Sequence, residues 1–158
     1  MAEKHLKVPL IPQKKSMSCW YAAACMVNAY FEHGPRYGIP GEWTNNTGLA
    51  FADFDTLAKN ENLTYIGSSN HKFTAETLIK ALGTYGPILC SGKWKGYGHA
   101  VTITGCSTEG AGNGTVYYND PEPKDQGSTA QISMDDFNAN RLLGLMLIRD
   151  PATLPKAA

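Results

Sequence analysis

The hydrophobic pattern of this chain changes its period near Pro87, and this change is the strongest constraint on the fold. Before it, apolar residues recur mostly at helical spacing; the predicted helices cover residues 20–31, 49–60 and 73–82, with a brief strand over 63–66. After it, apolar and polar residues alternate; the predicted strands cover residues 87–90, 99–104, 115–120, 129–133 and 142–148. Ser133 is expected to cap a short helix that ends near residue 137. Helices followed by mostly antiparallel strands are typical of an α+β domain.

Length and charge bound the class of protein. The 158 residues are enough for one domain with a substantial core, which we assign to residues 8–150. The 14 basic and 14 acidic side chains balance, so neither a nucleic acid nor a membrane is indicated as a partner. The N-terminus lacks the apolar core of a signal peptide, and no apolar run reaches membrane-spanning length, which predicts a protein made in a cytosol. We expect a mobile N-terminal arm and a frayed tail after Pro151.

The four cysteines show no close pairing of the C-x-x-C kind; they are Cys19, Cys25, Cys90 and Cys106. A chain of this length needs no disulfides, so we expect free thiols. The cysteines and the four histidines also lack the spacing of zinc ligands. We therefore expect neither a metal nor a cofactor.

Cys19 stands out because it falls in the first turn of the first predicted helix. Ser18 is a good N-cap, which would leave Cys19 among unpaired backbone N–H groups at the positive end of the helix dipole. This setting favours an anion, and the thiolate is the reactive form of cysteine. The side-chain amide of Gln13 and the Cys19 N–H could together stabilise an oxyanion if the intervening segment curls back. Against this interpretation, most free cysteines are buried and pack as small hydrophobic residues.

A cysteine nucleophile needs a base nearby. His33 lies at the far end of the same helix, about 20 Å from Cys19 at 1.5 Å per residue, so it cannot serve. His5 belongs to the N-terminal arm and His71 to a polar turn, where both would face solvent. His99 begins an apolar strand directly after a glycine-rich loop, so its side chain can face a cleft while the sheet fixes its backbone.

A third group has to hold the base in the correct tautomer. If the strands over 99–104 and 115–120 form a hairpin, Asp120 comes near His99, because the start of one strand lies beside the end of the other. A register slip of one residue would present Asn119 instead, whose side-chain oxygen could also orient an imidazole. The alternative is that His99 is a core or edge histidine and that Asp120 is a turn residue.

Three segments, in this order, resemble the papain-like cysteine peptidases; they are Gln13 with five residues before Cys19-Trp20, Gly98-His99-Ala100-Val101, and Tyr118-Asn119-Asp120-Pro121. The opening from Val8 to Cys19 is especially similar to small bacterial papain-like proteases, which include the avirulence protease of plant pathogens and peptidase domains carried as toxins. The resemblance covers residues 8–148 and is weak over 34–84. It implies a two-lobed papain-like fold, with the active site in the cleft between a helical lobe and the sheet.

The resemblance also implies a role for each site residue. Cys19 would be the nucleophile, and His99 the base and later the acid. Asp120 would orient His99, while Gln13 and the Cys19 N–H would form the oxyanion hole. Candidate substrate contacts in the cleft are Trp20, Trp94 and Tyr97.

Double-glycine peptidases share the Gln and Cys spacing, but Ser18 and Trp20 replace their typical acidic and small residues. We therefore expect a cysteine endopeptidase that acts on protein substrates through an acyl-enzyme, as a bacterial effector or interbacterial toxin. It would be made in a bacterial cytoplasm and delivered by a specialised secretion system to a target-cell cytoplasm. A cognate immunity protein that occludes the cleft would be its main binding partner.

Two alternatives remain. The same Cys-His-Asp arrangement can deamidate glutamine, transfer acyl groups as a transglutaminase does, or act as a peptidoglycan amidase. A catalytically silent binding module could also have kept the fold, although such a module has no chemical reason to retain Cys19, His99, Asp120 and Gln13 together.

Overall fold

The structure is a computed structural model, and it describes residues 2–32, 53–66, 72–94, 96 and 98–154 of the chain. In chain order the elements are β1 (Glu3–His5), α1 (Cys19–Phe31), α3 (Asp53–Asn60), β2 (Leu63–Tyr65), α4 (Ala75–Tyr85), β3 (Ile88–Gly92), β4 (His99–Ser107), β5 (Thr115–Asp120), β6 (Ser128–Ser133), α5 (Met134–Asn140), β7 (Arg141–Arg149) and the 3-10 turn η1 (Pro151–Thr153). The expected α+β class is confirmed. Residues 49–52 of the second predicted helix lie outside the described residues.

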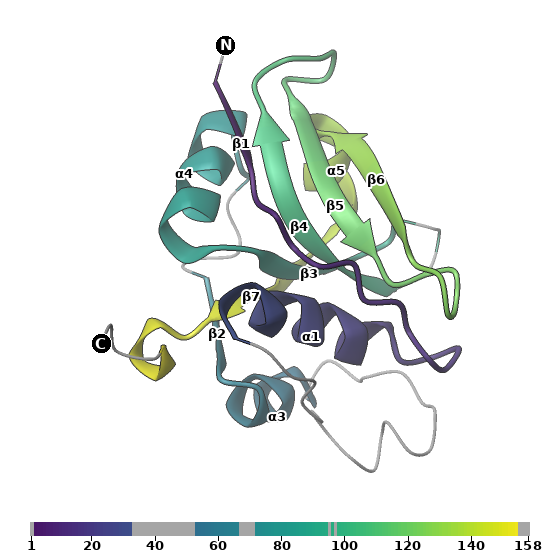
Figure 1. Cartoon of the computed structure of the whole chain (residues 1–158). Helices are drawn as coiled ribbons and strands as arrows, with labels where there is room; N and C mark the ends of the chain where they lie inside the picture. The colour runs from purple at the N-terminus through teal and green to yellow at the C-terminus, as the bar shows by residue number, and fades with distance from the viewer. Residues whose placement is uncertain (1, 33–52, 67–71, 95, 97, 155–158) are drawn as a thin grey trace.

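In the described part of the chain, one antiparallel sheet of seven strands carries the fold (Figure 1). Its strands follow the order β2-β7-β3-β4-β5-β6, and β1 pairs with the part of β4 beyond its pairing with β3. β4 and β5 form the predicted hairpin, with Thr102 opposite Asn119 and Ile103 opposite Tyr118. The start of β4 therefore lies beside the end of β5.

Alternate residues of the sheet pack against different helices. Val101 and Ile103 of β4 belong to the core cluster formed with α4 and α5. Ala100 belongs to the cluster formed with α1 and α3, and Thr102 Oγ1 donates a hydrogen bond to the Ala23 carbonyl of α1 at 3.0 Å. Helices therefore cover both faces of the sheet, and α1 is fixed against β4. The division into two lobes stays a prediction.

Helix α1 begins at Cys19, as the sequence predicts. Ser18 occupies the N-cap position, but its side chain makes no capping hydrogen bond, so that prediction was wrong. The Ser18 hydroxyl instead accepts from the Lys15 N–H at 3.1 Å and donates to the Lys15 carbonyl at 3.0 Å, which closes the turn before the helix. Ser133 caps α5 as predicted, because its hydroxyl accepts from the Asp136 N–H at 3.1 Å.

The N-terminal arm is part of the sheet, which corrects the expectation of a mobile arm. β1 pairs with Gly105–Ser107 at the end of β4. Gly105 permits this close approach, because a Cβ atom there would stand 2.9 Å from the Lys4 carbonyl oxygen. Beyond β1, the Asn119 side-chain amide donates to the Val8 carbonyl at 3.2 Å. The arm therefore runs along β4 and reaches the end of β5 (Figure 1).

The chain after β7 is anchored up to Thr153, so the expectation of a frayed tail is wrong for this stretch. Arg149 is 2 % exposed, and its Nη2 donates to the Thr153 carbonyl at 2.9 Å. The Nη1 atom of Arg149 donates to Glu32 Oε1 at 2.8 Å and to Asn28 Oδ1 at 3.1 Å. One buried guanidinium thereby ties the tail to α1.

Candidate active site

Cys19 differs from the other cysteines in its exposure. All four cysteines are free thiols, as predicted, and Cys25, Cys90 and Cys106 are buried, whereas Cys19 is partly exposed. Burial raises the pKa of Cys90 to about 12 and the pKa of Cys106 to about 11, so both thiols stay protonated at neutral pH. Cys19 combines its exposure with a position at the N-terminal end of α1, where an anion is stabilised.

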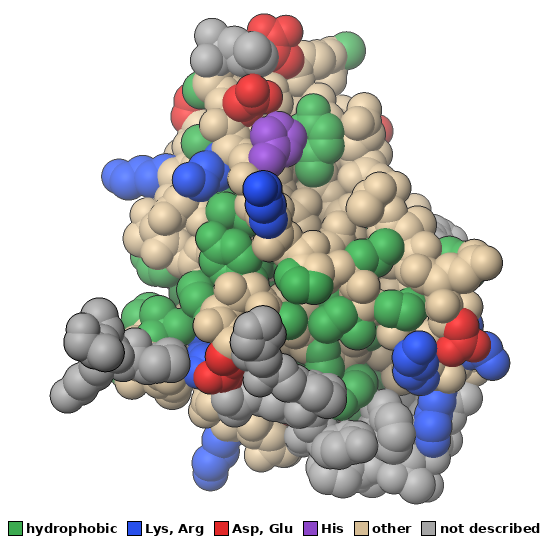
Figure 2. Space-filling model, in the orientation of Figure 1, with side chains coloured by type: hydrophobic (Ala, Val, Ile, Leu, Met, Phe, Trp, Pro, Cys, Tyr) green, Lys and Arg blue, Asp and Glu red, His purple; other side chains and the backbone are tan. Residues whose placement is uncertain are grey.

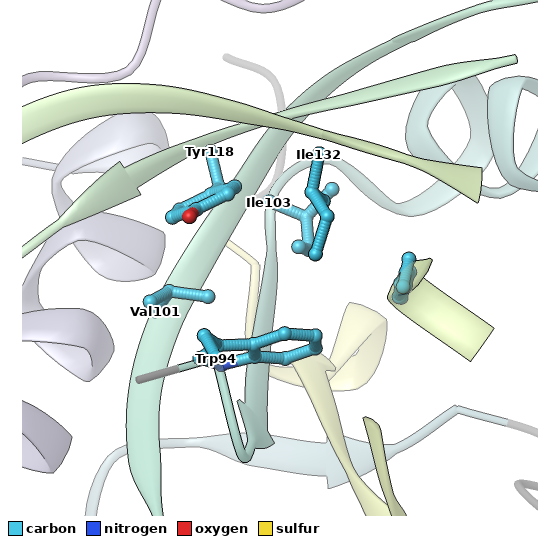
Figure 3. Close-up of a pocket in the computed structure, with 6 residues that line it drawn as sticks. Trp94, Val101, Ile103, Tyr118 and Ile132 are labelled. Atoms are coloured by element: carbon cyan, nitrogen blue, oxygen red, sulfur yellow. The ribbon is translucent and has the colours of Figure 1, made fainter. Parts of the chain in front are cut away.

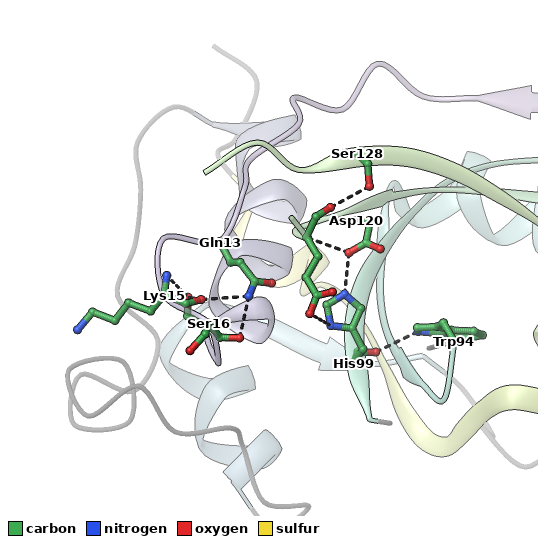
Figure 4. A network of polar contacts seen from close by, with 9 residues as sticks. Gln13, Lys15, Ser16, Trp94, His99, Asp120 and Ser128 are labelled. Atoms are coloured by element: carbon green, nitrogen blue, oxygen red, sulfur yellow. Dashed lines mark hydrogen bonds and ion pairs between the residues drawn. The ribbon is translucent and has the colours of Figure 1, made fainter. Parts of the chain in front are cut away.

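His99 and Asp120 form a buried pair at the open end of the β4–β5 hairpin (Figure 4). His99 Nε2 lies 2.6 Å from Asp120 Oδ1, and the two side chains are 1 % and 5 % exposed. The register explains this contact: Thr102 stands opposite Asn119, so Asp120 falls one residue further along, on the face of the hairpin that also carries His99. The Asn119 amide is bound to Val8 instead. Of the two candidates for the orienting group, the structure brings Asp120 to His99.

The partners of His99 favour its protonated form. Burial by itself lowers the pKa of His99, but hydrogen bonds with Asp120 and Cys19, together with the charges of these groups, raise it from 6.5 to about 9. Because Nε2 is engaged by Asp120, Nδ1 is the nitrogen left for the Cys19 sulfur. At neutral pH the ring is therefore an imidazolium between the Asp120 carboxylate of β5 and the Cys19 side chain of α1.

Glu122 is a site residue that the sequence analysis missed. Its Oε1 atom lies 3.7 Å from His99 Nδ1. Its backbone N–H donates to Asp120 Oδ1 at 2.9 Å, and its carbonyl accepts from the Ser128 hydroxyl at 2.8 Å. The available signal was an acidic residue two positions after Asp120, but the strand pattern ends at Asp120 and says nothing of where a loop side chain points.

Gln13 is held beside the loop that follows β5, with its side-chain donors turned to its own segment (Figure 4). The residue is 2 % exposed. Its two side-chain N–H groups donate to the Lys15 carbonyl at 3.0 Å and to the Ser16 carbonyl at 2.9 Å. Its backbone N–H donates to the Pro121 carbonyl at 3.0 Å, and its carbonyl accepts from the Asp125 N–H at 2.9 Å. The segment before α1 is therefore tied to the loop after β5, and the side-chain amide is engaged locally; the role of Gln13 in an oxyanion hole stays a prediction.

Trp20 is not exposed for substrate contact, which corrects one of the three aromatic candidates. It is 1 % exposed in the core formed with α3 and the sheet, because the helix turns by about 100° per residue and carries the neighbour of Cys19 inward. The Trp94 indole N–H donates to the His99 carbonyl at 3.0 Å. Its ring belongs to a small apolar pocket (Figure 3), lined by Trp94, Val101, Ile103, Tyr118, Ile132 and Phe137. Tyr97 lies outside the described residues, as do His33 and His71.

The groups at the site suit acyl transfer. A thiol at a helix start, an imidazole and a carboxylate that holds the imidazole are the set that such chemistry uses. Among the described residues, no three His, Cys, Asp or Glu side chains are grouped as ligands for a metal ion. No helix in the described ranges has the length and apolar character needed to cross a membrane. On the face drawn in Figure 2, basic and acidic side chains are interspersed.

The comparison with known protein families agrees with this chemistry. A family model described as papain-like cysteine protease AvrRpt2 matches residues 2–141. The matched span includes helix α1 with the segment before it and the whole β4–β5 hairpin, which contain Cys19, His99 and Asp120. The chain therefore belongs to the family of papain-like cysteine proteases that AvrRpt2 represents, and it is a cysteine protease, a hydrolase of peptide bonds.

Proposed function

We propose that Cys19, His99 and Asp120 form a catalytic triad that cleaves internal peptide bonds of protein substrates. The Cys19 thiolate attacks the carbonyl carbon of the scissile bond and forms a tetrahedral oxyanion. His99 then donates a proton to the leaving amine, the C–N bond breaks, and a thioester remains on Cys19. The neutral His99 next takes a proton from water, which attacks the thioester and releases the second product.

The observation that carries this proposal is the 2.6 Å contact between His99 Nε2 and Asp120 Oδ1, with Cys19 hydrogen-bonded to the same ring. The nucleophile, the base and the orienting group come from three elements, α1, β4 and β5, that are distant in the sequence. A binding module needs no nucleophile beside such a pair, so it has no chemical reason to keep Cys19, His99 and Asp120 together. This consideration favours catalysis over the non-catalytic alternative.

The backbone N–H of Cys19 is the first donor that we assign to the oxyanion. It lies at the N-terminus of α1, which the Ser18 side chain does not cap. Gln13 is the second donor in this proposal. To act so, its amide has to exchange the carbonyl of Lys15 or Ser16 for the oxyanion.

We infer further that the protein is a bacterial effector or interbacterial toxin, delivered by a specialised secretion system. Its substrate is then a protein of the target cell, and the producing cell needs an immunity protein that occludes the site. The support for this role is the family alone. A product of a neighbouring gene that blocks alkylation of Cys19 is the expected sign of such an immunity protein, and the absence of any such inhibitor would count against a toxin.

The decisive experiment compares the wild type with Cys19→Ala in a bacterial lysate and scores new protein N-termini by mass spectrometry. Cys25→Ala is the matched control, because it makes the same change on the same helix at a buried position. A defined set of cleavages with the wild type and Cys25→Ala, but not with Cys19→Ala, supports the endopeptidase. One-dalton mass increases or cross-links without new termini would favour a deamidase or transglutaminase, and released peptidoglycan peptides an amidase.

A further inference from the structure

The imidazole of His99 lies between two carboxylates. Asp120 Oδ1 is 2.6 Å from Nε2, and Glu122 Oε1 is 3.7 Å from Nδ1. A neutral imidazole has one N–H group, so one of its nitrogens would turn a lone pair toward an anion in this arrangement. An imidazolium presents an N–H group on both nitrogens, and it fits both carboxylates. The geometry on both sides of His99 therefore favours the charged ring.

Glu122 is held in place by its backbone. Its N–H group donates to Asp120 Oδ1 at 2.9 Å, and its carbonyl accepts from the Ser128 hydroxyl at 2.8 Å. Its side chain is 23 % exposed, whereas the His99 side chain is 1 % exposed. The carboxylate thus stands at the border between solvent and the buried ring, on the nitrogen that the Cys19 sulfur also needs.

Among the described residues, ionisable groups reach the ring from different elements: Cys19 from α1, Asp120 from β5 and Glu122 from the loop after β5. In the same loop, Asp125 pairs with Lys14 at 3.9 Å, and both of these side chains are at least 60 % exposed. Solvent and salt screen such exposed charges, so they act weakly on the ring. Among the described carboxylates of this loop, Glu122 therefore acts on the ring most directly, at ion-pair distance from Nδ1.

We propose that Glu122 is a positioning residue of the triad, whose carboxylate holds the His99 imidazolium through an ion pair on its Nδ1 side, the side assigned to the Cys19 sulfur. This inference rests on the proposed function. The Glu122 charge has an effect that can be measured: it keeps the proton on His99 to higher pH, because a nearby anion favours the imidazolium. It thereby extends the pH range over which His99 can protonate the leaving amine.

The test is the pH titration of His99, followed by nitrogen NMR of labelled histidine, which needs no knowledge of the substrate. In Glu122→Gln, the midpoint of the His99 titration profile is expected to move to lower pH by about one unit, the scale on which a neighbouring charge acts. Glu109→Gln is the matched control, because Glu109 is an exposed residue of the β4–β5 connection and loses the same charge. Its profile should coincide with that of the wild type. Glu122→Asp, which keeps the charge on a shorter stem, should recover part of the shift.

The outcomes separate this inference from the proposed function. If the Glu122→Gln profile coincides with the wild type while Cys19 still reacts with iodoacetamide faster than a small free thiol, Glu122 has no such role and the triad stands. If wild-type Cys19 reacts no faster than a free thiol, and His99→Ala changes nothing, the proposed function itself fails. Should Glu122→Gln not fold, nitrogen NMR of labelled histidine in the wild type decides: both His99 nitrogens are expected to carry protons at pH 7, and a bare Nδ1 would overturn the inference.

Discussion

Replacing Asp120 by alanine is expected to lower kcat/KM by roughly 10- to 100-fold. Among the groups that raise the pKa of His99 from 6.5 to about 9 against the effect of burial, the hydrogen bond of Asp120 is the largest. One pKa unit corresponds to about 1.4 kcal/mol between the two protonation states, so the net effect is worth about 3 kcal/mol. The share of Asp120 is therefore ~1–3 kcal/mol, which gives the expected loss of rate.

Asp120→Asn separates the charge from the geometry. The amide oxygen of the asparagine can still accept a hydrogen bond from His99 Nε2. It can also accept from the Glu122 N–H group, which in the wild type donates to Asp120 Oδ1 at 2.9 Å. We therefore expect a smaller loss than with alanine. In both variants the alkaline limb of the activity profile, expected near pH 9 in the wild type, should move to lower pH because the imidazolium has lost its anion.

The assay is kcat/KM as a function of pH, on a peptide that carries one of the cleavage sites found in the lysate. Asn119→Ala is the matched control, because this neighbouring side chain binds the Val8 carbonyl and not His99. Its alkaline limb should stay at the wild-type position. If Asp120→Ala kept both the wild-type kcat/KM and the wild-type limb, Asp120 would not orient His99, and the reasoning from the buried pair would be refuted.

Two further predictions concern the thiols and the stability. Iodoacetamide at neutral pH is expected to label Cys19 first, because burial shields the other thiols and raises the pKa of Cys90 and Cys106; peptide mass mapping that found Cys90 or Cys106 labelled first would contradict this. The pKa of His99 is about 9 in the folded protein and 6.5 without its partners. Protonation of His99 therefore stabilises the fold fully below about pH 6.5, and this stabilisation is lost as the pH rises through about 9. The Tm difference between the wild type and His99→Gln should therefore shrink from about pH 6 to about pH 10, and thermal melts in which it grew would rule this out.

The sequence by itself determined most of the secondary structure, though not strand β1, and the identity of the nucleophile candidate. Helical spacing and period-two alternation are relations between neighbouring residues, so they are sufficient to predict α1 and the β4–β5 hairpin. A cysteine in a first turn is likewise a local feature. The pairing of His99 with Asp120 followed from the alternation in the two strands, although the alternation alone also left Asn119 open.

Only the tertiary structure decided how the loops and the arm complete the site. The choice between Asp120 and Asn119 depends on the register of the β4–β5 hairpin, which puts Asp120 on the face of His99; the Asn119 amide binds the Val8 carbonyl of the arm across 111 residues of sequence. The position of Glu122 beside His99 and the tie between the Gln13 backbone and the loop after β5 depend on contacts of the same long-range kind. Such contacts form when the folded chain brings donors and acceptors from distant segments together. The periodicity of a single segment carries no information about that competition.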